Sequence, residues 1–160
     1  MPLYKTITPN SQTTVKIWKI TESYKDLFEP LDLKSNSLDR VLGMKSKLHQ
    51  RVFLSVRHLL RDSGYTDQDL YYDKNGKPHL KDGKHISITH SFTFSAIIIS
   101  DAEVGIDIEM QREKIGRIAT KFVDYEFQYL EKESDCYVRR LTVIWGIKES
   151  LYKLFATPGM

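Results

Sequence analysis

Four segments of the chain have the alternating or continuously apolar patterns that predict strands. Residues 14–20 have apolar side chains among lysines, which is typical of a strand with one buried face. Residues 86–89 and 94–100 also predict strands, and the second is almost wholly apolar, which favours a central place in a sheet. Residues 104–109 alternate again and predict a further strand.

Apolar residues recur at helical spacing elsewhere. The clearest helix is predicted over 46–62, and Gly64 follows it where a C-terminal cap belongs. The same spacing predicts a short helix over 37–44 and two later helices over 115–123 and 135–155. The second half of the chain is therefore predicted to be rich in helices.

Two tight turns separate the predicted strands. Asp73-Lys74-Asn75-Gly76 contains an Asn-Gly pair, which accepts the positive φ angles of a hairpin turn, and Asp82-Gly83 is a second such pair. The order of strands, helices, strands and helices predicts an α+β fold with an antiparallel sheet.

Composition places the chain among globular proteins. Its 160 residues suit one domain or two small lobes, with 41% hydrophobic and 28% charged residues. No apolar run is long enough to span a membrane, and residues 1–6 lack the apolar stretch of a signal peptide. Cys136 is the single cysteine, which excludes an intrachain disulfide and a cysteine-based metal site. A cytoplasmic location is the expectation, with no membrane partner.

The charge balance is mildly basic. Twenty-four Lys and Arg against 21 Asp and Glu give a net charge of +3, which permits an anionic partner without requiring one. Basic residues between Lys45 and Arg61 leave nucleic-acid binding open as a hypothesis. The small charge and the lack of interleaved exposed aromatic residues argue against that hypothesis.

Two carboxylates stand at alternate positions of a predicted strand. Asp107 and Glu109 would share one face, where their charges repel unless a cation lies between them. Mg²⁺ accepts one to three protein carboxylates and completes its shell with water and phosphate. The alternative is a plain acidic edge facing solvent.

A second constellation lies on the last predicted helix. Trp145, Glu149 and Lys153 follow one another at intervals of four and so share one stripe. Glu149 would add a third carboxylate and Lys153 an ammonium group. An ordinary surface Glu–Lys pair is the alternative, although Trp145 on the same stripe favours partial burial.

Two shorter motifs carry groups that suit an anion. Thr89-His90-Ser91 ends a predicted strand, and Lys77-Pro78-His79 follows the first turn, where proline would hold Lys77 at a rigid corner. A Ser-His-Asp hydrolase fits the residue types of the first motif, but no Gly-x-Ser-x-Gly elbow is present. A hydrogen-bonded loop and a solubilising lysine are the alternatives.

The sequence contains no Walker loop, no dinucleotide-binding glycine fingerprint and no His-x-x-x-His zinc pair. No role is predicted for the scattered histidines His49, His58, His79 and His85.

The four motifs in this order resemble those of the 4′-phosphopantetheinyl transferases. The resemblance spans residues 15–155 and is strongest to the surfactin-synthetase-activating type. Members of that type are monomers of two pseudo-symmetric halves with antiparallel sheets. Its most specific parts are Gly105-Ile106-Asp107-Ile108-Glu109 and Trp145-Gly146-Ile147-Lys148-Glu149-Ser150-Leu151-Tyr152-Lys153. Their joint occurrence outweighs the structural alternative for each motif alone.

The resemblance implies transfer of the 4′-phosphopantetheine arm from coenzyme A to a serine of an apo acyl, peptidyl or aryl carrier protein. It implies a Mg²⁺ site at Asp107, Glu109 and Glu149, and a catalytic role for Glu149 and Lys153. Lys77, Thr89, His90, Lys153 and Arg51 would contact coenzyme A, with Lys45 and Lys47 beside Arg51. Fatty-acid, polyketide and nonribosomal-peptide pathways all stay open, and no nucleic-acid partner is expected.

The chain is shorter than the larger family members. The resemblance divides it into an N-terminal half, 1–103, and an incomplete C-terminal half, 104–160. A truncated, non-catalytic module that binds coenzyme A or a carrier protein is therefore the alternative to an enzyme.

Overall fold

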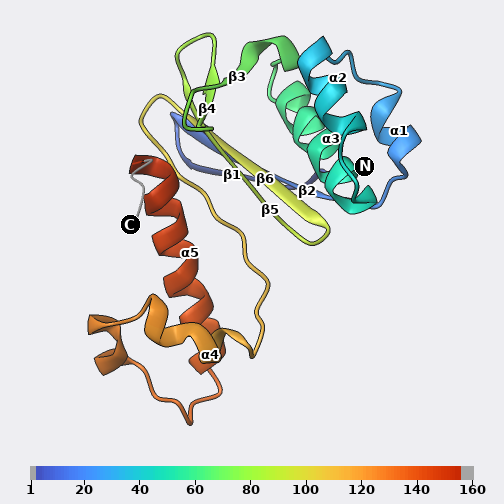
Figure 1. Cartoon of the computed structure of the whole chain (residues 1–160). Coiled ribbons are helices and arrows are strands. Elements are labelled where there is room, and N and C mark those ends of the chain that lie inside the picture. Colours follow the sequence, from blue (N-terminus) through green and yellow to red (C-terminus); the bar gives the residue numbers. More distant parts are fainter. Residues whose placement is uncertain (1–2, 156–160) are drawn as a thin grey trace.

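Residues 3–155 are described in this computed structural model, and a four-stranded antiparallel sheet forms their centre (Figure 1). The strand order is β1-β2-β6-β5, so β2 and β6 are central. The bounds are Leu3–Asn10 for β1, Thr13–Lys19 for β2, His85–Ser91 for β5 and Phe94–Ser100 for β6. The predictions for 14–20, 86–89 and 94–100 are confirmed, as is the central position of the apolar strand.

Three helices form a layer beside this sheet (Figure 1). The helix α3 packs on β2 and β6, and α1 and α2 pack on α3. Their bounds are Tyr24–Phe28 for α1, Ser35–Leu42 for α2 and Lys47–Asp62 for α3. The two predicted helices are confirmed to within two residues. The main core fills the space between α3 and the sheet, and its fully buried members include Leu54, Leu59, Leu60 and Ile97.

A small hairpin stands beside the main sheet and confirms the first predicted turn. Its strands are β3, Leu70–Tyr72, and β4, Pro78–Leu80, which pair antiparallel. Gly76 in the turn has a φ of +81°, which only glycine adopts without strain. The hairpin places Lys77 next to the C-terminal helix described below.

The C-terminal part is helical and has a small core of its own. It contains α4, Ile115–Ile118, two 3-10 turns over Ala119–Lys121 and Tyr125–Tyr129, and the long helix α5, Tyr137–Phe155. Ala119, Val123 and Leu141 are buried together there. The α+β class and the antiparallel sheets are confirmed, and the part of 104–160 that is described holds helices and no strand.

The prediction of a strand over 104–109 is wrong. Within the described range 3–155, these residues belong to neither sheet and form no ladder with a strand. The N–H groups of Ile106 and Ile108 donate instead to the side-chain hydroxyls of Ser87 and Thr89. Alternation in a sequence reports which side chains are buried and does not report where the backbone bonds go, which explains the error. We call residues 105–109 the acidic strip.

Removal of the N-cap of α3 tests how this helix is anchored. The Ser46 hydroxyl accepts a hydrogen bond from the His49 N–H at 3.2 Å. Ser46→Ala should lower the free energy of unfolding by about 1 kcal/mol, because one N–H of the first turn loses its partner. Ser46→Asp should restore most of the loss in urea denaturation. Equal stability of the alanine variant and the unaltered chain would contradict the assignment.

Candidate functional site

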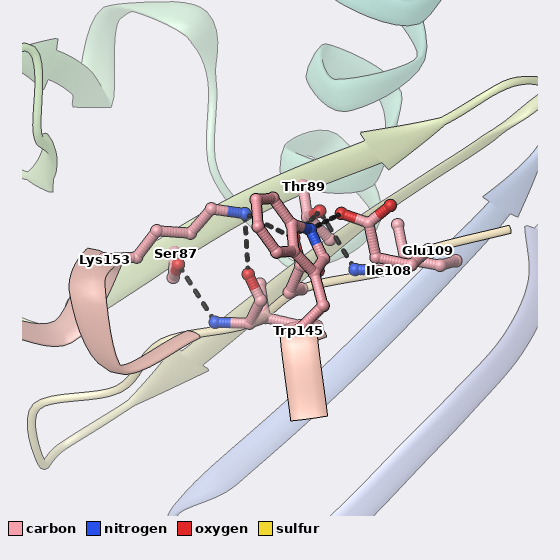
Figure 2. Close-up of polar contacts among 8 residues, drawn as sticks. Ser87, Thr89, Ile108, Glu109, Trp145 and Lys153 are labelled. Carbon is pink, nitrogen blue, oxygen red and sulfur yellow. Dashed lines mark hydrogen bonds and ion pairs between the residues drawn. The ribbon is translucent and has the colours of Figure 1, made fainter. Parts of the chain in front are cut away.

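The acidic strip lies between the sheet and α5 and is held from both sides (Figure 2). On the sheet side, its N–H groups are bonded to Ser87 and Thr89. On the helix side, the Lys153 ammonium donates to the carbonyl of Ile106 at 2.9 Å, and the Trp145 indole N–H donates to the Glu109 carboxylate at 3.0 Å. The predicted stripe on the last helix is confirmed at Trp145 and Lys153, because both side chains reach the strip.

Close packing at Gly105 brings the strip against α5. A Cβ at Gly105 would lie 2.0 Å from the carbonyl oxygen of Ser150, well inside van der Waals contact. Only glycine therefore fits this position without displacing the strip or the helix. The close approach places the carboxylates of the strip beside the side chains of α5.

Asp107 is the buried charge at the centre of the site. Its side chain is 6% exposed, and its Oδ1 lies 3.2 Å from the Lys153 ammonium. The Thr89 hydroxyl also donates to Oδ1 over a long 3.4 Å. Its Oδ2 is buried and has no hydrogen-bond partner among residues 3–155. A buried carboxylate oxygen without a donor is costly, and a bound cation would satisfy it.

Glu109 shares this crowded charge environment. Burial raises the pKa of Glu109, and the negative charge of Asp107 raises it further, while the hydrogen bond from Trp145 opposes the shift. Glu149 is near enough for its charge to raise the same pKa. Neighbouring negative charges repel one another, and a bound cation relieves this repulsion.

The donor set fits a divalent cation that completes its shell with other oxygens. Among residues 3–155, no three or more His, Cys, Asp or Glu side chains form a ready ligand cluster. Asp107 and Glu109 supply two carboxylates, and the unpartnered oxygen of Asp107 is available to a cation. Mg²⁺ is held in this way in many phosphate sites, with water and phosphate oxygens in its remaining positions. A third ligand from Glu149 stays a prediction.

Histidines gather at the end of β5 next to the start of α3. The rings of His90 and His49 are 6.1 Å apart and meet edge to face. Burial lowers the pKa of His90 below its usual value, and the charges of His49 and Lys153 lower it further. The sequence pattern gave His49 no role, because its proximity to His90 depends on how α3 packs. Its place in the first turn of α3, among basic residues, was the available signal.

Two other predicted contacts of coenzyme A, Lys77 and Arg51, donate hydrogen bonds to backbone carbonyls. The Lys77 ammonium donates to the carbonyl of Leu154 at 3.0 Å, so the hairpin is tied to the end of α5. Arg51 donates to the carbonyl of Glu22 at 3.4 Å. Lys77 and Arg51 thus have partners inside the protein, and Lys77 lies on the Lys153 side of the site.

Two cavities border the ion pair between Asp107 and Lys153. One, of about 510 Å³, lies along the acidic strip and α5 and is lined by Asp107 and Glu109. The other, of about 370 Å³, is lined by Lys77, Pro78, Tyr152 and Lys153. An elongated ligand with a charged centre would find carboxylates in the first cavity and ammonium groups in the second.

Within residues 3–155, none of the helices has the length and apolar character that a membrane crossing requires.

Comparison with known proteins relates this site to one superfamily. Residues 103–160 match the family model described as the 4′-phosphopantetheinyl transferase superfamily, and this region contains the acidic strip and α5. The chain is 32% identical over 121 residues to Enterobactin synthase component D of Salmonella typhi, which covers 73% of this chain and 51% of the relative. The protein of that name from Salmonella typhimurium gives the same values.

A third relative is the 4′-phosphopantetheinyl transferase gsp of Aneurinibacillus migulanus. It is 32% identical over 101 residues, which cover 61% of this chain and 43% of the relative. The chain spans about half the length of the curated relatives it matches.

Proposed function

We propose that the chain is a 4′-phosphopantetheinyl transferase that moves the phosphopantetheine arm of coenzyme A onto a carrier protein, because residues 103–160 match the model of that superfamily and the relatives described above are each 32% identical to the chain. The acceptor is a serine of an apo acyl or peptidyl carrier protein, and adenosine 3′,5′-bisphosphate leaves. The buried, unpartnered oxygen of Asp107 carries the proposal, because it supports a cation site next to Lys153 in the region that matches the family model.

The proposed reaction is a phosphoryl transfer. The serine oxygen forms a bond to the phosphorus that bears the pantetheine arm, and the P–O bond to the bridging oxygen breaks. Glu149 is the proposed acceptor of the serine proton. Mg²⁺ held by Asp107 and Glu109 would neutralise charge on the pyrophosphate.

Lys153 is the proposed second source of positive charge. Its ammonium is held by the carbonyl of Ile106 and by Asp107, which fixes it at the border of the second cavity. A fixed ammonium costs no reorganisation when charge moves onto the leaving oxygen. Lys77 and His90 are proposed to contact other phosphate oxygens of coenzyme A, with Thr89 and Arg51 at the periphery. We propose His49 as a further member of this group, because its ring contacts that of His90.

A basic and apolar surface beside Glu109 is proposed to receive the carrier protein. A groove of about 240 Å³ is lined by Glu109, Met110, Arg112, Lys114 and Ile118, among others. The Arg112 guanidinium lies 4.3 Å from the centre of the Phe92 ring, at the tip of the β5–β6 hairpin. Carrier proteins are typically acidic, so charge attraction would orient a carrier with its serine near Glu109.

Charge reversal at this surface should weaken carrier recognition and leave the chemistry intact. Arg112→Glu should raise the KM for the carrier about tenfold, with kcat within about twofold, because it removes attraction at the rim of the site. Steady-state kinetics with varied carrier concentration measure both constants. Lys84→Glu is the matched control, since Lys84 pairs with Asp101 at 3.6 Å and lies outside the groove. Equal KM values for both variants would contradict this docking surface.

The decisive experiment is a carrier-modification assay. The chain is incubated with apo carrier protein and coenzyme A, with and without Mg²⁺, and the carrier is weighed by intact-mass spectrometry. A gain of one phosphopantetheine group that requires both coenzyme A and Mg²⁺ would support the transferase. Carrier or coenzyme A binding without any mass gain would support the non-catalytic module instead.

A further inference from the structure

The acidic strip is attached to the sheet by side-chain hydroxyls where a strand would use carbonyl groups. Ser87 and Thr89 on β5 are each 4% exposed. The Ser87 hydroxyl accepts from the N–H of Ile106 at 3.2 Å, and the Thr89 hydroxyl accepts from the N–H of Ile108 at 3.1 Å (Figure 2). The two acceptors and the two donors have the same spacing of two residues, so the bonds form a matched pair.

The position of the two hydroxyls decides where the strip runs. Ile86 on β5 belongs to the core under α3, so Ser87 and Thr89, at alternate positions, point to the opposite face of the sheet. A hydroxyl reaches out from that face, whereas a backbone carbonyl would bind a neighbour at the edge. The strip is thereby held where Lys153 and Trp145 of α5 contact it from the other side.

We infer that Ser87 and Thr89 are positioning residues, whose hydroxyls set the register of the acidic strip and so place Asp107 and Glu109. The inference rests on the proposed function only for the purpose that the carboxylates serve. Because side chains alternate along an extended segment, a slip of one residue would turn both carboxylates away from α5. Two hydroxyls at matched spacing oppose such a slip.

The bonds of Thr89 also limit what else this residue does. Its oxygen accepts from the Ile108 N–H, and its hydrogen is directed to Asp107 at 3.4 Å. A hydroxyl has one hydrogen and two lone pairs, so most of its bonding capacity is used inside the protein. Ser87 lies two residues further from His90 along β5 than Thr89 does, and it belongs to none of the predicted motifs.

Amide hydrogen exchange, followed by NMR on the intact chain, tests the inference directly. Ser87→Ala should speed exchange at Ile106 about fivefold, since a hydrogen bond of this kind contributes about 1 kcal/mol. Thr89→Val should do the same at Ile108, whereas Thr89→Ser, which keeps the hydroxyl, should retain protection. Ser55→Ala is the matched control: Ser55 is fully buried on α3 and bonds Ser95 on the other face of the sheet.

A second measurement tests whether the register of the acidic strip controls the placement of Asp107 and Glu109. Binding of Mn²⁺ in the presence of coenzyme A, followed by electron paramagnetic resonance, should be about tenfold weaker for Ser87→Ala and Thr89→Val than for Ser55→Ala. The affinity for coenzyme A alone should not change in Ser87→Ala. This split separates loss of placement from general loss of stability, which the Ser55 variant shares.

The results that would contradict the inference differ from those that would contradict the proposed function. Unchanged exchange at Ile106 in Ser87→Ala, or equal changes in Ser55→Ala, would overturn the inference. Weaker coenzyme A binding by Thr89→Val, with exchange at Ile108 unchanged, would make Thr89 a ligand contact and overturn its positioning role. Protected amides in a chain that never modifies a carrier would refute the proposed function and leave the positioning role intact.

Discussion

Replacement of Asp107 by asparagine should slow carrier modification by about 10²–10³-fold. The amide has nearly the shape of the carboxylate and retains an oxygen, but it removes the negative charge that faces Lys153. It also removes the charge at the unpartnered oxygen, where we place the cation. Time courses of carrier mass, at saturating coenzyme A and several Mg²⁺ concentrations, measure the loss.

The control for this variant is Asp101→Asn. Asp101 is an exposed carboxylate at the end of β6 that pairs only loosely with Lys84, at 3.6 Å. The Asp101→Asn variant removes one negative charge from the segment that connects β6 to the acidic strip, but it does not touch the strip. Its rate of carrier modification should therefore stay within about twofold of that of the unaltered chain. An Asp107→Asn variant that modifies carriers at the normal rate would remove Asp107 from the mechanism.

Replacement of Gly105 by alanine should disrupt the site by a steric route. Its methyl group would lie 2.0 Å from the Ser150 carbonyl oxygen, so the strip and α5 must move apart. Overpacking of this kind costs about 1–3 kcal/mol, and a displacement of about 1 Å at a catalytic group lowers rates about 10²-fold. We expect near-complete loss of carrier modification and faster amide exchange in α5, with the main sheet still protected.

Gly116→Ala is the matched control for this steric effect. A Cβ at Gly116 would lie 3.8 Å from the Tyr137 ring, which is ordinary contact. Both variants add one methyl group to the C-terminal part, yet only the first should separate α5 from the strip. Equal exchange rates in α5 for the two variants would show that the close approach at Gly105 does not matter for the site.

The elements with strong periodicity were predictable because burial imposes that periodicity. The central strand β6 is almost wholly apolar because it is paired on both edges and α3 covers one of its faces. The helix α3 shows a clear apolar stripe for the same reason. By contrast, β1 is almost wholly exposed, so its sequence carries no alternation and it was not predicted.

The candidate site was predicted in its residues and only partly in its construction. Asp107, Glu109, Trp145 and Lys153 stand out by spacing, and the structure brings all four together. The strand expected over 104–109 does not form, because its N–H groups find hydroxyls rather than carbonyls. The roles of Ser87 and His49 depend on neighbours that are distant in sequence, so no local pattern marks them.

The sequence by itself determined the class of the fold, its central strands and helices, and the residue types that meet at the site. These follow from local periodicity and from spacing within one element, which side-chain direction along a strand or helix dictates. Only the tertiary structure decided that Asp107 has an unpartnered buried oxygen, that Gly105 packs against α5, and that the acidic strip is hydrogen-bonded to two hydroxyls. Such contacts depend on the relative placement of whole elements, and short-range patterns in a chain carry no record of that placement.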